Sequence, residues 1–132
     1  TSIFCRGGTQ MTIVCVDNTP IMLQSLKENA ETAYPNANVQ TFLSAKPALE
    51  YAAKYGCDVL LCEINPPRLE GLFLAEKVKN INPRVNIIFV TVCSESEHAK
   101  TVMKLKPSGY LTKEASGTQI LEELWNLRYP VA

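Results

Sequence analysis

The sequence contains no long hydrophobic run. Its 132 residues include no stretch near the roughly 20 apolar residues that cross a bilayer, and residues 1–10 lack the apolar core of a signal peptide. A membrane-spanning protein and a secreted protein are therefore not expected. We predict a soluble domain of the cytoplasm with no membrane partner.

The chain also has no net charge of either sign, because 13 Lys and Arg residues balance 13 Asp and Glu residues. A domain without an overall positive field has little long-range attraction for nucleic acid or for an anionic membrane surface. We therefore expect no direct nucleic-acid binding by this domain.

Cysteine is present, but not in the arrangement of a metal or disulfide framework. The chain has no CxxC pair, and most of its cysteines lie in or beside apolar runs, where a thiol behaves as a small hydrophobic group. This pattern suits a reducing compartment and argues against a zinc site. The five residues are Cys5, Cys15, Cys57, Cys62 and Cys93.

Motifs for nucleotide binding and for hydrolysis are absent. There is no P-loop and no GxGxxG, and the one histidine, His98, falls on an expected helix as a surface residue. A hydrolase built from Asp17, Glu63 and Lys113 would have no histidine, serine elbow or metal triad beside them. We expect a binding module and not an enzyme, with no required cofactor.

The chain does contain a regular alternation of β-rich runs and segments of helical period, which is typical of a parallel sheet covered by helices on both faces. With 132 residues, 46% of them hydrophobic, it is long enough for one domain. The expected fold class is α/β, a single doubly wound (βα)5 domain with a five-stranded parallel sheet. Strands are expected over Thr12–Asp17, Asn38–Phe42, Asp58–Ile64, Val85–Thr91 and Gly109–Thr112, and helices from near Pro20, Ala45, Leu69, Glu95 and Gly117.

Several helix boundaries have signals of their own. Pro20 suits the first position of a helix, and Ser44 and Ser116 are expected N-caps. Gln119 follows Ser116 at the spacing of a capping box. Gly56 is expected to end the second helix.

The two ends of the chain differ from its middle. Residues 1–10 are interpreted as an unused leader or an expression remnant before Met11, which directly precedes the first strand. Residues 11–127 are expected to form the domain. Residues 128–132, in which Pro130 breaks the last helix, are expected to begin a linker toward an output domain.

Polar side chains stand at the ends of four predicted strands. Asp17 and Asn18 follow the first strand, Glu63 ends the apolar run of the third, and Thr91 and Lys113 end the fourth and fifth. In a doubly wound sheet, ligands and chemistry collect in the crevice beyond the carboxyl ends of the strands. These residues are therefore the candidate site.

At these residues the chain resembles the receiver domain of two-component response regulators, from Met11 to about Leu127. The resemblance implies a flavodoxin-like, CheY-like sheet of order 2-1-3-4-5. The matching segments are IVCVDNTP with the acidic pair Asp17 and Asn18, LLCEINPPRLEG with Glu63 in the phosphoacceptor place and Pro67 and Gly71 in its loop, IIFVT with the switch hydroxyl Thr91, and SGYLTKE with Tyr110 and Lys113.

The resemblance implies a mechanism in which a sensor histidine kinase passes a phosphoryl group to an aspartate. It implies Mg²⁺ held at the positions of Asn18, Glu63 and the backbone carbonyl of Asn65, with Asp17 nearby. Lys113 would neutralise the phosphoryl oxygens, while Thr91 and Tyr110 would move as the switch.

This sequence departs from the family at residues that carry the chemistry. Glu63 replaces the acceptor aspartate, and its extra methylene moves the carboxylate by roughly 1.5 Å, away from in-line attack. Asn18 replaces a metal-binding acid and loses a full negative charge, which weakens a site for Mg²⁺. We expect phosphotransfer to fail or become very slow, and Mg²⁺ to bind weakly or not at all.

Two further departures lie beside the site. Val92 stands where the family usually has a small residue, and its branched side chain is expected to narrow access for phosphodonors. Glu114 replaces a proline that helps to hold a cis peptide after Lys113, and cis bonds before other residues cost about 2.5–4 kcal/mol. A displaced Lys113 ammonium is therefore expected.

Glu63 has two interpretations. Its longer carboxylate could reach into the phosphoryl position and pair with Lys113 or Thr91, giving a constitutively switched receiver. Alternatively, it is satisfied by Lys113 in a site freed from signalling, which we favour slightly because glutamate lacks the charge and oxygen count of a phosphoryl group. Thr91 and Tyr110 are likewise either a switch or structural residues.

The sequence therefore predicts a pseudo-receiver that controls transcription through an attached or separate output domain, or that forms a homodimer. Its working face is expected to comprise the helix from Glu95, the strand Gly109–Thr112 and the helix from Gly117. The ending EELWNLRYPV is similar to the junction of regulators with a LytTR-type DNA-binding domain. The alternatives are an active, atypical phosphoacceptor and a stand-alone adaptor.

Overall fold

Strands and helices alternate along the whole of the computed structural model, which describes residues 10–64, 70–91 and 99–131. Some predictions fall outside these residues. They concern the residues before Gln10, Cys93, His98, Asn65, Pro67, Val92 and the helix starts at Leu69 and Glu95.

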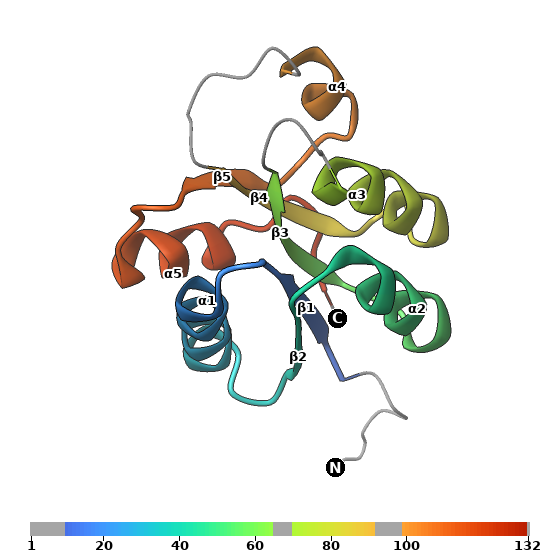
Figure 1. The fold of residues 1–132 in the computed structure, drawn as a ribbon. Coiled ribbons are helices and arrows are strands. Elements are labelled where there is room, and N and C mark those ends of the chain that lie inside the picture. The colour runs from blue at the N-terminus through green and yellow to red at the C-terminus, as the bar shows by residue number, and fades with distance from the viewer. Residues whose placement is uncertain (1–9, 65–69, 92–98, 132) are drawn as a thin grey trace.

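The strands form one parallel five-stranded sheet in the order β2-β1-β3-β4-β5 (Figure 1), as the sequence predicts. Asp17, Asp58 and Val85, which were expected in strands, lie one residue beyond a strand end. The bounds are β1 Thr12–Val16, β2 Asn38–Phe42, β3 Val59–Ile64, β4 Asn86–Thr91 and β5 Gly109–Thr112.

The helices cover both faces of the sheet. Helices α1 and α5 lie on one face, while α2 and α3 lie on the other (Figure 1), and Val102 of α4 packs into the same core cluster as α2 and α3. The bounds are α1 Pro20–Ala33, α2 Ala45–Tyr55, α3 Glu70–Ile81, α4 Ala99–Lys104 and α5 Gly117–Trp125. No helix in the described ranges is both long and apolar enough to cross a membrane.

The core has two halves, one on each side of the sheet. In β3, Val59 and Leu61 pack toward α1 and α5, whereas Leu60, Cys62 and Ile64 pack toward α2 and α3. Because successive side chains point to opposite faces, a strand covered on both sides is apolar at every position. This explains the continuous apolar run that ends at Glu63.

Helix starts follow the predicted signals with one exception. Pro20 occupies the first turn of α1, and Ser116 and Gln119 form a complete capping box at α5. Ser44 stands at the N-cap position of α2, but its side chain makes no capping hydrogen bond. Gly56 ends α2 with φ of 87°, a conformation that favours glycine.

Helix α5 ends at Trp125, well before Pro130, which was expected to break it. Two side chains form hydrogen bonds with carbonyl groups in its last turn. Asn126 Nδ2 donates to Glu122 O at 2.9 Å, and the Tyr34 hydroxyl donates to Leu124 O at 2.6 Å. The helix therefore stops because its terminal acceptors are satisfied from outside, not because proline breaks it.

The two N-cap serines provide a matched test of which serine caps its helix through a side-chain hydrogen bond. We expect Ser116→Ala to lower the free energy of unfolding by about 1 kcal/mol, because it removes the capping box. Ser44→Ala should change it by less than about 0.5 kcal/mol, since no capping bond is lost. Urea unfolding followed by circular dichroism measures both, and equal losses in the two variants would contradict the assignment.

Candidate functional site

Three strands deliver charged side chains to one point at the carboxyl edge of the sheet. Asp17 follows β1, Glu63 is the fifth residue of β3, and Lys113 follows β5. The backbone N–H of Lys113 donates to Thr91 O at 2.9 Å, which anchors the start of the loop beside β4. The parallel register thus gathers residues that are far apart in the sequence.

Lys113 bridges the two acids. Its Nζ lies 2.8 Å from Asp17 Oδ1 and 2.5 Å from Glu63 Oε2, and 3.4 Å from Thr19 Oγ1. Lys113 thus reaches both carboxylates, while the expected displacement of its ammonium relative to other receivers, argued from Glu114, stays a prediction. We call Asp17, Glu63 and Lys113 the acid–lysine triad.

The triad lies largely out of solvent. The side chain of Asp17 is fully buried, while those of Glu63 and Lys113 are 9% and 17% exposed. Burial lowers the pKa of Lys113, but hydrogen bonds to Asp17 and Glu63 outweigh it and raise this pKa above its ordinary value. The ammonium is therefore held in its charged form.

Asp17 is the most deeply placed member of the triad. Its Oδ1 accepts both from Lys113 Nζ and from the backbone N–H of Thr19, each at 2.8 Å. Its Oδ2 is buried and has no hydrogen-bond partner. One oxygen of this buried carboxylate is thus left without a hydrogen bond from the described residues.

Asn18 and Thr19 form the exposed rim next to Asp17. The Thr19 hydroxyl donates to Asn18 Oδ1 at 3.3 Å, and the Asn18 backbone N–H donates to Glu63 Oε1 over a long 3.5 Å. Sequence reasoning missed Thr19 as a site residue. Its position directly after the acidic pair was the available signal.

Gly71 fixes the position of the Glu63 backbone. A Cβ at this residue would lie 1.7 Å from the Glu63 carbonyl oxygen, so only glycine lets α3 approach β3 this closely. Buried Cys62 also donates its thiol to Gly71 O at 3.5 Å. The helix α3 and the strand end that bears Glu63 are therefore tightly joined.

The two predicted switch residues occupy different environments. Thr91 ends β4 in register with Ile64 and Thr112, beside the backbone of Lys113. Tyr110 instead lies away from the triad: its hydroxyl contacts Met103 Sδ of α4 at 3.9 Å, and its ring lies 6.0 Å from Phe89. Thr91 is thus part of the site edge, whereas Tyr110 lies on an outer face.

The donor set fits Mg²⁺ poorly. Among the residues that the structure describes, no group of three His, Cys, Asp or Glu side chains could hold a metal ion. Asp17 Oδ2 offers one free anionic oxygen, but Lys113 already bonds the other Asp17 oxygen and Glu63. Mg²⁺ needs several oxygen ligands in octahedral geometry, and a cation between the acids opposes a second one.

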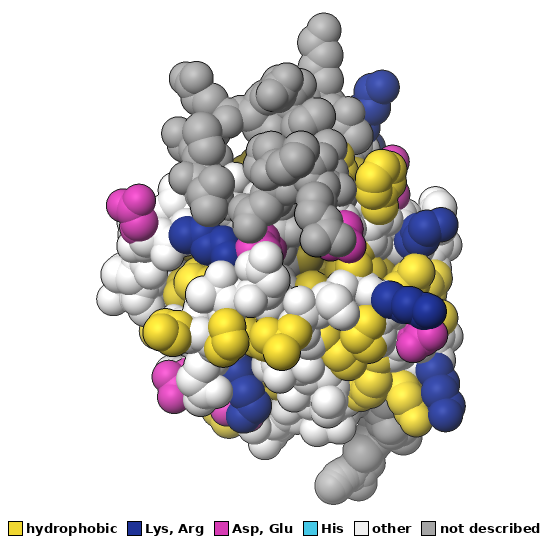
Figure 2. Space-filling view, viewed as in Figure 1, with side chains coloured by type: hydrophobic (Ala, Val, Ile, Leu, Met, Phe, Trp, Pro, Cys, Tyr) yellow, Lys and Arg dark blue, Asp and Glu magenta, His cyan; other side chains and the backbone are white. Residues whose placement is uncertain are grey.

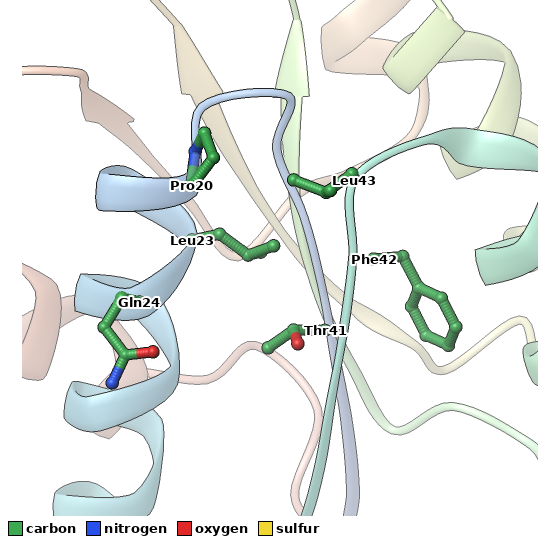
Figure 3. Close-up of a pocket in the computed structure, with 6 residues that line it drawn as sticks. All are labelled: Pro20, Leu23, Gln24, Thr41, Phe42 and Leu43. Carbon is green, nitrogen blue, oxygen red and sulfur yellow. The ribbon is translucent and has the colours of Figure 1, made fainter.

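A separate hollow of about 430 Å³ lies between α1 and β2, beside the start of α1. It is lined by Pro20, Leu23 and Gln24 from the helix and by Thr41, Phe42 and Leu43 from the strand and its end (Figure 3). Hydrophobic side chains also gather over this part of the surface (Figure 2). The residues that line the hollow include no acid, base or cysteine, so its lining offers no charged group like those of the triad.

Comparison with known proteins gives a consistent result. The sequence model of the response regulator receiver domain matches residues 13–124. The chain is 25% identical over 104 residues to the Fimbriae Z protein of Salmonella typhimurium, covering 76% of this chain and 48% of that protein. It is 24% identical over 113 residues to the nitrate/nitrite response regulator protein NarL of Escherichia coli, and the match covers 86% of this chain and 52% of NarL. The chain thus spans about half the length of these curated relatives.

Solved structures share the fold. A CheY-like receiver domain from Methanospirillum hungatei superposes with a TM-score of 0.76 at 23% identity, covering 88% of this chain and 91% of that one. The receiver domain of AraT from Geobacillus stearothermophilus superposes with a TM-score of 0.74 at 23% identity, covering 85% of this chain and 88% of that one. The fold is thus shared with these structures, and the match of the receiver-domain sequence model over residues 13–124 shows that the chain belongs to the response regulator receiver domain family.

Proposed function

We propose that this chain is a pseudo-receiver: a signalling domain that acts through protein contact and not through phosphoryl transfer, and that has no enzymatic activity of its own. The observation that carries the proposal is the bridge from Lys113 to both Asp17 and Glu63. In this arrangement the positive charge that would meet an incoming phosphoryl group is already neutralised within the protein.

The chemistry of the triad supports an inert site. For phosphotransfer, a carboxylate oxygen must be free to attack in line beside a metal ion. Glu63 Oε2 is bonded to Lys113 at 2.5 Å, and Asn18 supplies no negative charge for a metal. Receiver domains typically bind Mg²⁺ at their acidic pocket, but these residues do not fit the ion.

Between the two interpretations of Glu63, the contacts favour a satisfied residue over a phosphoryl mimic. The resemblance implies that Tyr110 turns inward when the switch is on. Here Tyr110 is 45% exposed and contacts Met103 on α4. Glu63 is therefore better described as held by Lys113 than as imitating the phosphorylated state.

The proposed contact face comprises α4, β5 and α5. Each element contributes a large exposed apolar side chain: Met103 at 62%, Tyr110 at 45% and Trp125 at 58% exposure. Such side chains lose unfavourable contact with water when a partner covers them. We propose that an attached or separate output domain, or a second copy of the chain, docks on this face.

The proposed setting is transcription in the cytoplasm. The printed name of one relative, 25% identical, is Transcriptional regulatory protein MctR of Rhizobium johnstonii, and the match covers 52% of its length. This likeness supports the proposal that the chain is the receiver part of a transcriptional regulator with an output domain. The proposal of a LytTR-type output rests on the ending EELWNLRYPV alone.

A second function is favoured by one observation, the unpartnered buried oxygen of Asp17. A buried anionic oxygen without a hydrogen bond is a possible cation ligand, and a bound cation is what an active phosphoacceptor requires. The chain would then be an atypical receiver that accepts phosphate on Glu63. The stand-alone adaptor is a third function, and no contact in the domain distinguishes it from the first.

Intact mass spectrometry after incubation with acetyl phosphate and Mg²⁺ separates the first two functions. We expect no added mass on the wild-type chain, because Lys113 occupies the acceptor carboxylate. Glu63→Asp combined with Asn18→Asp should gain one phosphoryl group, since it shortens the acceptor and restores the second acid. A phosphoryl mass on wild type that is lost in Glu63→Gln would instead establish the active receiver.

Removing the bridging ammonium should destabilise the fold. Lys113→Met leaves two largely buried carboxylates uncompensated, and we expect a loss of about 2–4 kcal/mol in the free energy of unfolding at neutral pH. The matched control is Lys27→Met, which breaks an exposed pair with Glu31 at 3.1 Å and should cost less than about 0.5 kcal/mol.

The pH dependence has a definite sign. The raised pKa of Lys113 means that its stabilisation is complete below the ordinary lysine pKa of about 10.4 and is lost as pH rises through the folded-state pKa. The difference in unfolding free energy between wild type and Lys113→Met should therefore shrink above about pH 10.4. A difference that is constant from neutral to alkaline pH would show that the bridge does not stabilise the protein.

A further inference from the structure

The C-terminal segment returns to the sheet after α5 (Figure 1) and is fastened there by one buried side chain. Asn86, the first residue of β4, is 0% exposed. Its Nδ2 donates to Tyr129 O at 2.8 Å, and its Oδ1 accepts from the Tyr129 backbone N–H at 2.7 Å. Asn86 thus pairs with both backbone groups of Tyr129, as a neighbouring strand would.

Ser108 adds a second attachment just before β5. Its hydroxyl donates to Asn86 Oδ1 at 2.9 Å and accepts from the Arg128 backbone N–H at 3.0 Å. Release of the segment would remove both Tyr129 backbone partners of the buried Asn86 amide, which would keep the Ser108 hydroxyl and a longer 3.4 Å bond to Asp58 O. Each lost hydrogen bond contributes about 0.5–1.5 kcal/mol. The position of Arg128 and Tyr129 is therefore built into the fold.

This attachment places the Tyr129 ring among three cations. Lys79 Nζ lies 4.7 Å from the ring centroid, Arg84 Cζ 5.3 Å and Arg128 Cζ 5.9 Å. Lys79 Nζ also donates to the Tyr129 hydroxyl at 3.3 Å. The last turn of α3, the connection to β4 and the C-terminal segment thus converge on one aromatic ring, and we call these four residues the Tyr129 cluster.

The positive charge of the Tyr129 cluster is not balanced locally. None of its three cations forms an ion pair with a carboxylate in the described part of the chain. Lys79, and then Arg128, hold the pKa of the Tyr129 hydroxyl below its usual value, which reports the same positive field. Like charges this close repel, and an anion bound among them would relieve the repulsion.

We propose that the Tyr129 cluster is an interaction surface for a carboxylate-rich segment of a protein partner. Arginine presents its donors as a planar fork that matches a carboxylate, and lysine adds a point charge. A DNA duplex fits less well, because three cations fall short of the roughly 6–10 phosphate contacts of strong DNA binding. The cluster lies at the amino end of β4, opposite the triad, so this inference is independent of the proposed function.

A titration of the ¹⁵N-labelled full chain with an oligoglutamate peptide at low salt tests the proposal. We expect saturable shifts of the Arg84, Arg128 and Tyr129 amide signals, and Arg84→Gln combined with Arg128→Gln should weaken binding about fivefold or more. Lys54→Gln is the matched control, because Lys54 also lies over a tyrosine ring, that of Tyr55 at 5.2 Å, but as a single cation. Its affinity should equal that of wild type.

Ser108→Ala tests whether the attachment of the C-terminal segment contributes to peptide binding. The substitution keeps every cation but removes the hydrogen bond from the Arg128 backbone N–H. We expect about two- to threefold weaker binding from lost preorganisation. Equal affinity in the wild type and the double arginine variant, or shifts at lysines throughout the chain, would overturn the proposal. Tighter binding of a short DNA duplex at the same residues would overturn it in favour of nucleic acid.

Discussion

The rest of the site depends on the ion pairs that Lys113 forms with Asp17 and Glu63. These three residues lie at or just after the carboxyl ends of β1, β3 and β5, and the parallel sheet of order β2-β1-β3-β4-β5 places those strand ends at one edge. Because Asp17 is buried, its charge requires a partner within the fold. The same pairing that stabilises the sheet edge removes the free carboxylate and the free ammonium that phosphoryl chemistry needs.

The two ends of the sheet therefore differ in electrostatic character. At the carboxyl end, the side chains of Asp17, Glu63 and Lys113 are largely buried and form ion pairs with one another. At the amino end, buried Asn86 fastens the C-terminal segment so that three cations surround Tyr129, none of them paired with a carboxylate of the described residues. A domain without net charge can still be polarised. Here the charges of the acid–lysine triad pair with one another, whereas the cations of the Tyr129 cluster are available to a partner.

Much of the fold follows from local sequence pattern, because strands buried on both faces are apolar throughout and helices show their own period. The predicted strand Asn38–Phe42 and the helix starts at Pro20, Ala45 and Gly117 agree with the structure. The end of α5 does not, because Asn126 and Tyr34 satisfy its last carbonyl groups from positions that periodicity does not include. Ser44 shows the reverse case, in which a suitable residue occupies the N-cap without making the bond.

The candidate site was predictable to a similar degree. Strand ends identified Asp17, Glu63 and Lys113, but the position of the Lys113 ammonium depends on contacts with two acids, each at least 50 residues away. The argument from Glu114 considered only the local peptide bond and could not include these contacts. Asn86 could not have been linked to Tyr129, 43 residues later, because a polar residue at the start of a strand has many local explanations.

A crystal structure of the wild-type chain grown with Mg²⁺ and beryllofluoride would test the central claim most directly. The account predicts that Lys113 Nζ remains hydrogen bonded to Asp17 and Glu63, with no beryllofluoride on Glu63. Beryllofluoride bonded to the Glu63 carboxylate, with Lys113 turned to meet it and a metal ion beside Asp17, would contradict the account and establish a working phosphoacceptor.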